Sequence, residues 1–188
     1  MANVNFPRGL QPHRNLMRAT EYKIPAAYAQ DLFVYDPVIT IATGRDINIA
    51  TAGTGNPVTG SILAIYDLDK VPLAYWDSGH VGEGYVIVAD HPEQLFVCQG
   101  DGVATFLDED DANANVNFAA GATGSLVNYL SGWEIDESDA GDAGVAGDQL
   151  RLIRSVQGVD NTVGIANADW IVQINNHTQS VGIVGVGV

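Results

Sequence analysis

The stretch DQLRLIRSVQGVDNTVGIANADWIVQINNH, residues 148–177, decides the fold that this sequence predicts. It contains two apolar runs, 150–156 and 170–174, separated by a loop rich in Gly, Asn and Asp. The second run alternates with a period of two, which is typical of a half-buried strand, and its strongest apolar residues are Trp170, Val172 and Ile174. The first run changes phase at 153–154, where one extra residue, a β-bulge, restores the alternation. We therefore expect two long strands joined by a broad loop at the centre of a sheet.

Similar apolar runs recur along the chain at short spacing, with Gly-rich and Asp-rich turns between them. A chain of 188 residues is long enough for one domain that buries about 70% of its unfolded surface. Counting the runs predicts eight to ten short strands and almost no helix, hence a single all-β domain of sandwich or barrel-like form. We expect 94–100 to be the hairpin partner of 84–90, and 108–125 to be a loop. The further expected strands are 32–42, 47–51, 61–68, 70–79 and 126–136.

Both ends of the chain differ from its middle. Residues 1–25 hold Pro7, Pro12 and Pro25 with little periodicity, which predicts an extended N-terminal arm, either frayed or docked on a partner surface. Residues 26–177 form the predicted all-β domain. Residues 178–188 form an apolar C-terminal tail, which we expect to add a strand to a neighbouring subunit or to its own sheet.

Charge is distributed unevenly. The formal net charge is −15, and four of the eight basic residues lie within the first 23 positions. From residue 71 to residue 150 there is no Lys or Arg but there are 15 acidic residues. An acidic body repels phosphate, so direct nucleic-acid binding is not expected. The N-terminus lacks the apolar core of a signal peptide and no run of 18 apolar residues occurs, so we expect no membrane partner and a place of action in the cytoplasm or on something assembled there.

Motifs for catalysis or cofactor binding are missing from the sequence. Cys98, the single cysteine, lies in an apolar run and is expected to be a buried small residue. The four histidines show no metal-ligand spacing, and no serine lies in a GxSxG motif. A hydrolase with a dispersed site has no support, so we expect no enzyme and no cofactor.

Two further features leave a choice between a binding role and a structural one. Acidic residues cluster at 108–111 and 136–148, where they supply either calcium ligands or merely a solvated surface; the EF-hand pattern fails because Ala140 occupies a ligand place. The three tryptophans form either a sugar-stacking face or parts of a core or subunit interface, and they are Trp76, Trp133 and Trp170. The alternative function is thus a carbohydrate- or calcium-binding β-sandwich module, which the resemblance described below would place on a virion surface.

Several segments, taken in order, resemble one known family. They are FPRGLQPHR (6–14), LFVYDPVITI (32–41), VADHPEQLFVCQGDG (88–102), LSGWEIDES (130–138) and LRLIRSVQGVDNTVGIANADWIVQINNH (150–177). Together they resemble the small capsid decoration proteins of tailed bacteriophages, also called cement or head-stabilising proteins. The last segment is the closest match, although Val159 stands where that family has Pro, and the tail runs further.

The resemblance implies a non-enzymatic homotrimer on the outer capsid surface of the virion, made in the host cytoplasm. Its partner would be the major capsid protein, and it would stabilise the contacts between capsid subunits. The basic arm would then lie along the shell. The residues expected to contact the capsid are Phe6, Arg8, Leu10, Arg14, Leu16 and Arg18.

Overall fold

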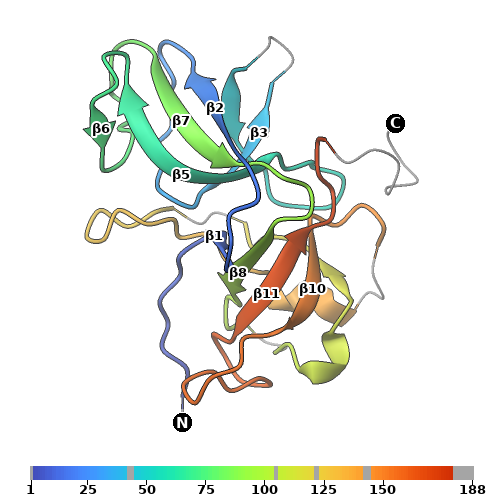
Figure 1. Ribbon diagram of the computed structural model, residues 1–188. Coiled ribbons are helices and arrows are strands. Elements are labelled where there is room, and N and C mark those ends of the chain that lie inside the picture. The colour runs from blue at the N-terminus through green and yellow to red at the C-terminus, as the bar shows by residue number, and fades with distance from the viewer. Residues whose placement is uncertain (1, 42–44, 104–105, 121–122, 142–144, 180–188) are drawn as a thin grey trace.

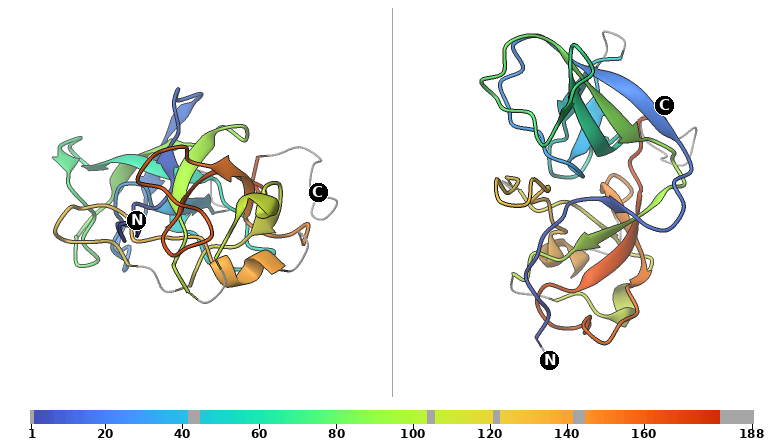
Figure 2. Two further views of the ribbon diagram at one scale, coloured as in Figure 1. Left: turned by 90° about the horizontal axis from the view of Figure 1, so that it is seen from below. Right: turned by 60° about the vertical axis from the view of Figure 1, so that its left-hand side comes forward.

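The computed structural model describes residues 2–41, 45–103, 106–120, 123–141 and 145–179. Within these ranges the chain is all-β, as predicted, with 11 strands in two antiparallel sheets and two short 3-10 helices. The two sheets lie one above the other in Figure 1, and the view turned about the vertical axis shows the same arrangement (Figure 2, right). No helix in the described ranges has the length and apolar character needed to cross a membrane.

The lower sheet of Figure 1, sheet A, contains the stretch that dominates the sequence. Its strand order is β1-β8-β11-β10-β9. The bounds are β1 Gln11–Pro12, β8 Leu95–Gln99, β9 Asn115–Val116, β10 Leu150–Ser155 and β11 Asp169–Ile174. The predicted strand pair is confirmed: β10 and β11 are antiparallel neighbours, β11 lies at the centre, and the register shifts between Leu152 and Arg154, at the expected bulge. Leu150 and Leu152 are buried before the shift, and Ser155 is the buried residue of β10 after it.

The upper sheet, sheet B, is built from the chain between β1 and β8. Its strand order is β2-β7-β5-β3-β4, with β6 paired to β5. The bounds are β2 Ala19–Ile24, β3 Pro37–Thr40, β4 Ile47–Ile49, β5 Gly60–Asp67, β6 Pro72–Leu73 and β7 Gly84–Ala89. Pro37 stands at the first position of its strand, where a missing N–H is tolerated.

The expected hairpin of β7 and β8 is wrong, because the two strands belong to different sheets. The turn at 90–94 carries the chain from sheet B to sheet A instead of reversing it. The chain also passes between the sheets at residues 13–18, which connect β1 to β2, and the two connections are bound to each other. Gln94 Oε1 accepts from Met17 N at 2.8 Å, and Arg18 Nε donates to Asp90 Oδ1 at 2.8 Å. The two connections between the sheets therefore stabilise each other.

Two predicted loop and strand assignments also change. The segment 126–136, expected to be a strand, forms only isolated bridges at Leu130 and Ile135. The segment 108–125, expected to be a loop, contains η1 (Glu109–Asp111) and β9, and η2 (Glu137–Gly141) follows later. Most of the predicted apolar tail, residues 180–188, lies outside the described residues.

The predicted N-terminal arm ends earlier than residue 25. Residues 19–24 form β2, which pairs with β7 along its whole length, and Tyr22 and Ile24 are buried. Their alternation with the exposed Glu21 and Lys23 is a strand pattern that the neighbouring Pro25 obscured. The boundary at 25/26 is therefore wrong, because the all-β fold already includes β2.

Each sheet has its own apolar core, and Ile49 packs against both. Leu10 joins the two halves directly. Its N–H donates to Tyr35 O at 3.0 Å, Ser61 Oγ donates to its carbonyl at 2.6 Å, and its side chain is fully buried in the core of sheet A. A residue that was predicted to contact a partner is thus an internal link between the sheets.

Leu10→Ala is expected to destabilise the fold by about 2–5 kcal/mol, because it leaves a cavity in the core of sheet A. The matched variant Leu16→Ala removes a side chain that is 46% exposed, and it should change stability by less than about 0.5 kcal/mol. Urea denaturation of both variants measures the difference. Equal losses would show that Leu10 does not link the two sheets.

Candidate partner-binding surface

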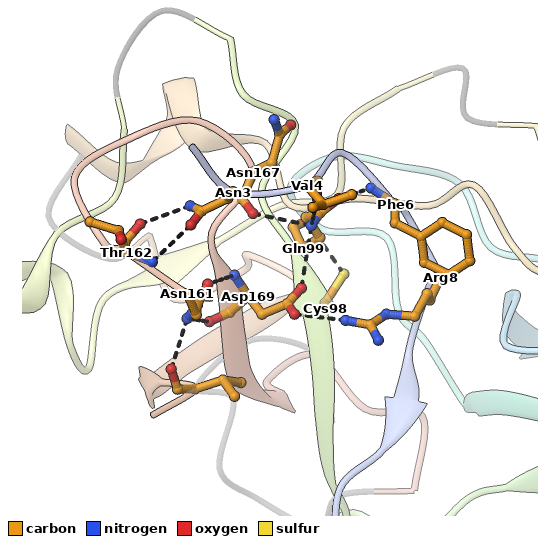
Figure 3. A network of polar contacts seen from close by, with 11 residues as sticks. Asn3, Val4, Phe6, Arg8, Cys98, Gln99, Asn161, Thr162, Asn167 and Asp169 are labelled. Atoms are coloured by element: carbon orange, nitrogen blue, oxygen red, sulfur yellow. Dashed lines mark hydrogen bonds and ion pairs between the residues drawn. The ribbon is translucent and has the colours of Figure 1, made fainter. Parts of the chain in front are cut away.

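The N-terminal segment, residues 2–18, is held on its own subunit by polar side chains, and its first part, 2–8, runs along one end of sheet A (Figure 3). Gln99 is the central one: it accepts from Phe6 N at 2.9 Å and donates to Val4 O at 3.0 Å. Asn3 exchanges two hydrogen bonds of 2.8 Å with the backbone of Thr162. These contacts give the segment a defined course on its own subunit.

Arginines fix the same segment further along. Arg8 forms an ion pair of 2.6 Å with Asp169, and Arg18 binds both the carboxylate and the carbonyl of Asp90. Gln179 also accepts from Arg18. Two of the three arginines that were predicted to contact a partner are therefore engaged with their own chain.

The remaining predicted contact residues divide by exposure. Leu10 is fully buried, whereas Phe6 and Leu16 are 45% and 46% exposed and Arg14 is also exposed. Two further apolar side chains of the segment, Val4 and Met17, are more exposed still, at 73% and 51%. The segment thus buries Leu10 and presents an apolar strip, which we define as Val4, Phe6, Leu16 and Met17.

A cavity of about 560 Å³ lies at the junction of the two halves. One wall comes from the connection before β3, with Asp31, Phe33 and Asp36, and the opposite wall from loop 123–126. Gly124 approaches Phe33 so closely that an added Cβ would lie 2.1 Å from a ring carbon, so only glycine fits there. This close contact brings the loop onto sheet B.

The loop that forms this wall continues into an exposed tip. Its base is closed by Ser125 N donating to Leu130 O at 2.9 Å. Leu126 and Val127 are 59% and 92% exposed, and Figure 1 shows the loop projecting from the side of the molecule between the sheets. A second hollow of about 330 Å³ lies on its other side and is lined by Phe6 and Val127. The projecting loop therefore connects the cavity with the apolar strip.

A stack of aromatic rings joins the loop, through its Tyr129, to Phe33 and Tyr75 of the half that contains sheet B. Phe33 stacks on Tyr75 with centroids 5.4 Å apart, and Tyr75 stacks on Tyr129 at 5.7 Å, with nearly parallel planes in both pairs. Stacks of this kind contribute about 0.5–1.5 kcal/mol per pair beyond burial. The loop is held by packing as well as by hydrogen bonds.

Asp36 is the chemically unusual residue of the cavity. It is 1% exposed, its Oδ2 accepts from Phe33 N at 2.8 Å, and the side chain of Ser131 also donates a hydrogen bond to the carboxyl. Burial raises the pKa of this carboxyl to about 7. The sequence offers no local pattern that predicts such a site.

The other candidate residues are placed away from solvent. Cys98 is buried as predicted, and burial raises the pKa of its thiol. His177 is 4% exposed, and burial lowers its pKa to about 4. All three tryptophans are at most 5% exposed, so none offers a ring face to a sugar.

The acidic loops do not converge. Among the residues with described positions, no group of three or more His, Cys, Asp or Glu side chains is arranged to hold a metal ion. Asp139 and Asp148 instead accept from the side-chain amide of Asn117, at 2.6 and 3.0 Å. Asp142, a member of the predicted ligand set, lies outside the described residues.

Comparison with known proteins finds no matching family model, no similar curated protein and no similar solved structure.

Gln99→Met is expected to release segment 2–8, because it removes the hydrogen bonds to Val4 and Phe6. Hydrogen exchange at the Phe6 amide should accelerate at least tenfold, for a loss of about 1–3 kcal/mol. Gln157→Met is the control, since Gln157 is exposed and its side chain donates to Ser155 Oγ, away from segment 2–8. Unchanged exchange at Phe6 in the Gln99 variant would contradict the anchoring role.

Asp36→Asn is expected to change how stability depends on pH. The folded-state pKa of Asp36 lies above its ordinary value, so its contribution is fully present below about pH 4 and is lost as the pH rises toward 7. The amide stays neutral, so the variant should gain on the order of 3 kcal/mol relative to wild type between pH 4.5 and pH 8. Urea denaturation at both pH values measures this gain, and an identical difference at both would refute it.

Proposed function

We propose that this chain is a non-enzymatic capsid decoration protein, which binds the outer surface of a tailed-bacteriophage head as a homotrimer and stabilises contacts between major capsid proteins. Two arguments support the proposal. The ordered sequence resemblance described above supplies the family, and the apolar strip of the anchored N-terminal segment supplies a surface for the partner. No feature of the described residues favours the carbohydrate- or calcium-binding alternative.

The observation that carries the proposal is the fixed course of the N-terminal segment. Its backbone is bound to Gln99 and Gln94 of sheet A and the adjoining turn, while Phe6 and Met17 point away from the core and stay exposed. A free arm loses conformational entropy when it binds, at about 1–2 kcal/mol per residue. This segment has lost that entropy on folding, so burial of the strip contributes directly to affinity.

Charge favours one orientation of the body on a partner. Between residues 71 and 150 the acidic side chains have no basic neighbours in sequence, and many of them lie in exposed loops. Such a surface is best solvated and repels other acidic surfaces. The proposal therefore places the strip against the shell and the acidic loops in solvent.

Decoration would act by mass action. A protein that binds the assembled shell and not its separated subunits stabilises the shell by its binding free energy. Three-fold symmetry would repeat the strip on each copy, so that one trimer contacts several capsid subunits at once. The effect would be a larger force needed to open the head.

The double variant Phe6→Ser, Met17→Ser is expected to bind undecorated heads about a hundredfold more weakly, because Phe6 and Met17 are about half exposed and burying the remainder of each contributes roughly 1–1.5 kcal/mol. Co-sedimentation with purified heads measures the binding. Val81→Ser is the control, because Val81 is 92% exposed but lies in a turn of sheet B.

Wild-type protein should reach a copy number near that of the major capsid protein. Absence of binding by the wild type would refute the decoration role. Undiminished binding by the double variant would refute only the role of the strip.

A further inference from the structure

We propose that the outer face of sheet A, which is turned away from the core of that sheet, is a docking surface for an acidic segment of a partner protein. We define this basic face as Arg14, Arg151 and Arg154 together with the apolar side chains of the strands between them, Val97 and Ile171. The inference goes beyond the decoration proposal, because it concerns a surface other than the apolar strip and does not require the partner to be a capsid protein.

The strand register shows which residues share this face, because residues directly opposite each other in antiparallel strands point to the same side of a sheet. Two rows of register partners cross sheet A on its outer side. The first row is Arg154, Ile171, Val97 and Gln11, and the second is Arg151, Gln173 and Leu95. Ile171 is 2% exposed, yet it belongs to neither apolar core of the described residues, which agrees with a position on the opposite side from the core.

The β-bulge of β10 brings two arginines onto this one face. In a regular strand, residues three positions apart point to opposite faces. The register shift between Leu152 and Arg154 adds one residue, so Arg151 and Arg154 both point away from the core while Leu150 and Leu152 are buried in it. A bulge that re-aims a side chain is a recurrent feature next to functional surfaces.

The third arginine comes from the opposite side of the sheet. His13 N donates to Leu95 O at 2.8 Å, which continues the pairing with β8 beyond the end of β1. Burial of the His13 imidazole lowers its pKa, and the charges of Arg14 and Arg154 lower it further. These charges therefore approach the same imidazole from the two sides of β8 and β11.

The positive charge of the face is not compensated by acidic neighbours. None of its three arginines forms an ion pair within the described ranges. Asp169 is the only acidic residue that the register of the sheet A strands places on this side, and Arg8 binds it at 2.6 Å. On a chain with a formal net charge of −15, the basic face is a surface of opposite sign that an acidic partner can recognise.

The guanidinium groups also have donors left for a ligand. Arg151 Nη2 donates to Asn113 Oδ1 at 3.3 Å, and Arg154 Nη1 donates to Ser155 O at 3.4 Å. Both hydrogen bonds are long and have neutral acceptors, and each guanidinium carries five N–H donors. A carboxylate can therefore bind these groups without breaking an ion pair.

The apolar part of the face favours a protein ligand over a nucleic acid, although arginine binds carboxylates and phosphates alike. Leu95 and Val97 are half-buried on the side of sheet A that carries the arginines, and apolar side chains of a peptide can pack on them. A phosphate backbone offers no such contact, and its dense negative charge is repelled by the acidic remainder of the molecule. The ligand that fits is a short segment in which carboxylates alternate with apolar residues.

One acidic residue borders the face and limits its affinity. Gln173 Nε2 donates to Pro92 O at 3.0 Å, which brings the turn 90–94 to the edge of the outer side. Glu93 of this turn is exposed, and a carboxylate at the edge repels an anionic ligand. Its removal is therefore expected to strengthen binding.

The direct test uses the acetylated and amidated peptide Ala-Glu-Leu-Glu-Ala as the probe, with Ala-Gln-Leu-Gln-Ala as its neutral isostere. In an extended chain the two glutamates are about 7 Å apart, the spacing of successive rows on a strand. Titration at low ionic strength is followed by the NMR shifts of the Val97, Arg154 and Gln173 amides. We expect saturable shifts with a millimolar dissociation constant that rises with salt, and binding of the glutamine peptide at least tenfold weaker. No saturable shift at these amides, or equal binding of both peptides, would overturn the proposal.

Variants then assign the binding groups. The double variant Arg151→Gln, Arg154→Gln should bind the glutamate peptide at least tenfold more weakly, and Glu93→Gln should bind it more tightly. The control is Lys23→Gln, Arg45→Gln, which makes the same charge change at exposed positions in the half that contains sheet B. Arg151→Gln alone alters an exposed side chain and should weaken binding severalfold, so the test stands even if the double variant is impaired. Unchanged affinity in both arginine variants, or an equal loss in the control, would refute the assignment.

Two further measurements exclude other occupants of the face. A short oligothymidylate is titrated in the same way, and tighter binding than that of the glutamate peptide at the same amides would overturn the choice of a protein partner. Sedimentation equilibrium compares the self-association of the wild type and the double arginine variant. Loss of self-association in the variant would assign the face to a second copy of this chain and would equally overturn the proposal.

The outcome is separable from that of the decoration proposal. Wild-type protein that does not bind heads refutes decoration and leaves the peptide titration unaffected. Conversely, head binding without saturable peptide shifts refutes the docking role of the basic face alone.

Discussion

The anchoring of Leu10 between the two sheets is the constraint on which the rest of the structure depends. Its backbone bonds to Tyr35 and Ser61 of the upper half, and its side chain lies in the core of the lower half. Gly9 makes this possible: it has φ of 66°, and an added Cβ would lie 2.4 Å from Tyr35 O. A larger residue at position 9 would push the two halves apart, so the placement of Leu10 between them requires Gly9.

The same junction creates the chemistry of the cavity. Asp36 comes one residue after Tyr35, whose carbonyl accepts from Leu10, and Ser131, which contacts the Gly9 position, donates its N–H to Val34 O at 2.9 Å. The segment 123–132 therefore contacts the connection before β3 at two places, through Gly124 against Phe33 and through the Ser131 hydrogen bond to Val34. A carboxyl buried at such a seam is shielded from water yet close to a surface loop. That burial raises the pKa of the Asp36 carboxyl.

The N-terminal segment serves the fold and the surface at the same time. Leu10 and Arg8 tie it to the body, and the residues before and after these anchors expose apolar side chains. A segment that is fixed by its own subunit presents those side chains without further ordering, which is the physical basis of the decoration proposal. The same feature means that a truncation through β2 would remove a strand of sheet B as well as the strip, so point variants distinguish the two roles.

Local patterns in the sequence determined the all-β class, the β10–β11 pair, its bulge and the burial of Cys98, because a period of two and its interruption are visible within a few residues. The alternation of Tyr22 and Ile24 was equally visible, although the prolines around it led to the assignment of an arm. Only the tertiary structure decided that β7 and β8 lie in different sheets, that Leu10 is internal and that Asp36 faces a cavity with loop 123–126. The physical reason is that strand partners and buried seams depend on contacts between residues distant in sequence, and periodicity records which face of a strand is apolar but not what covers it.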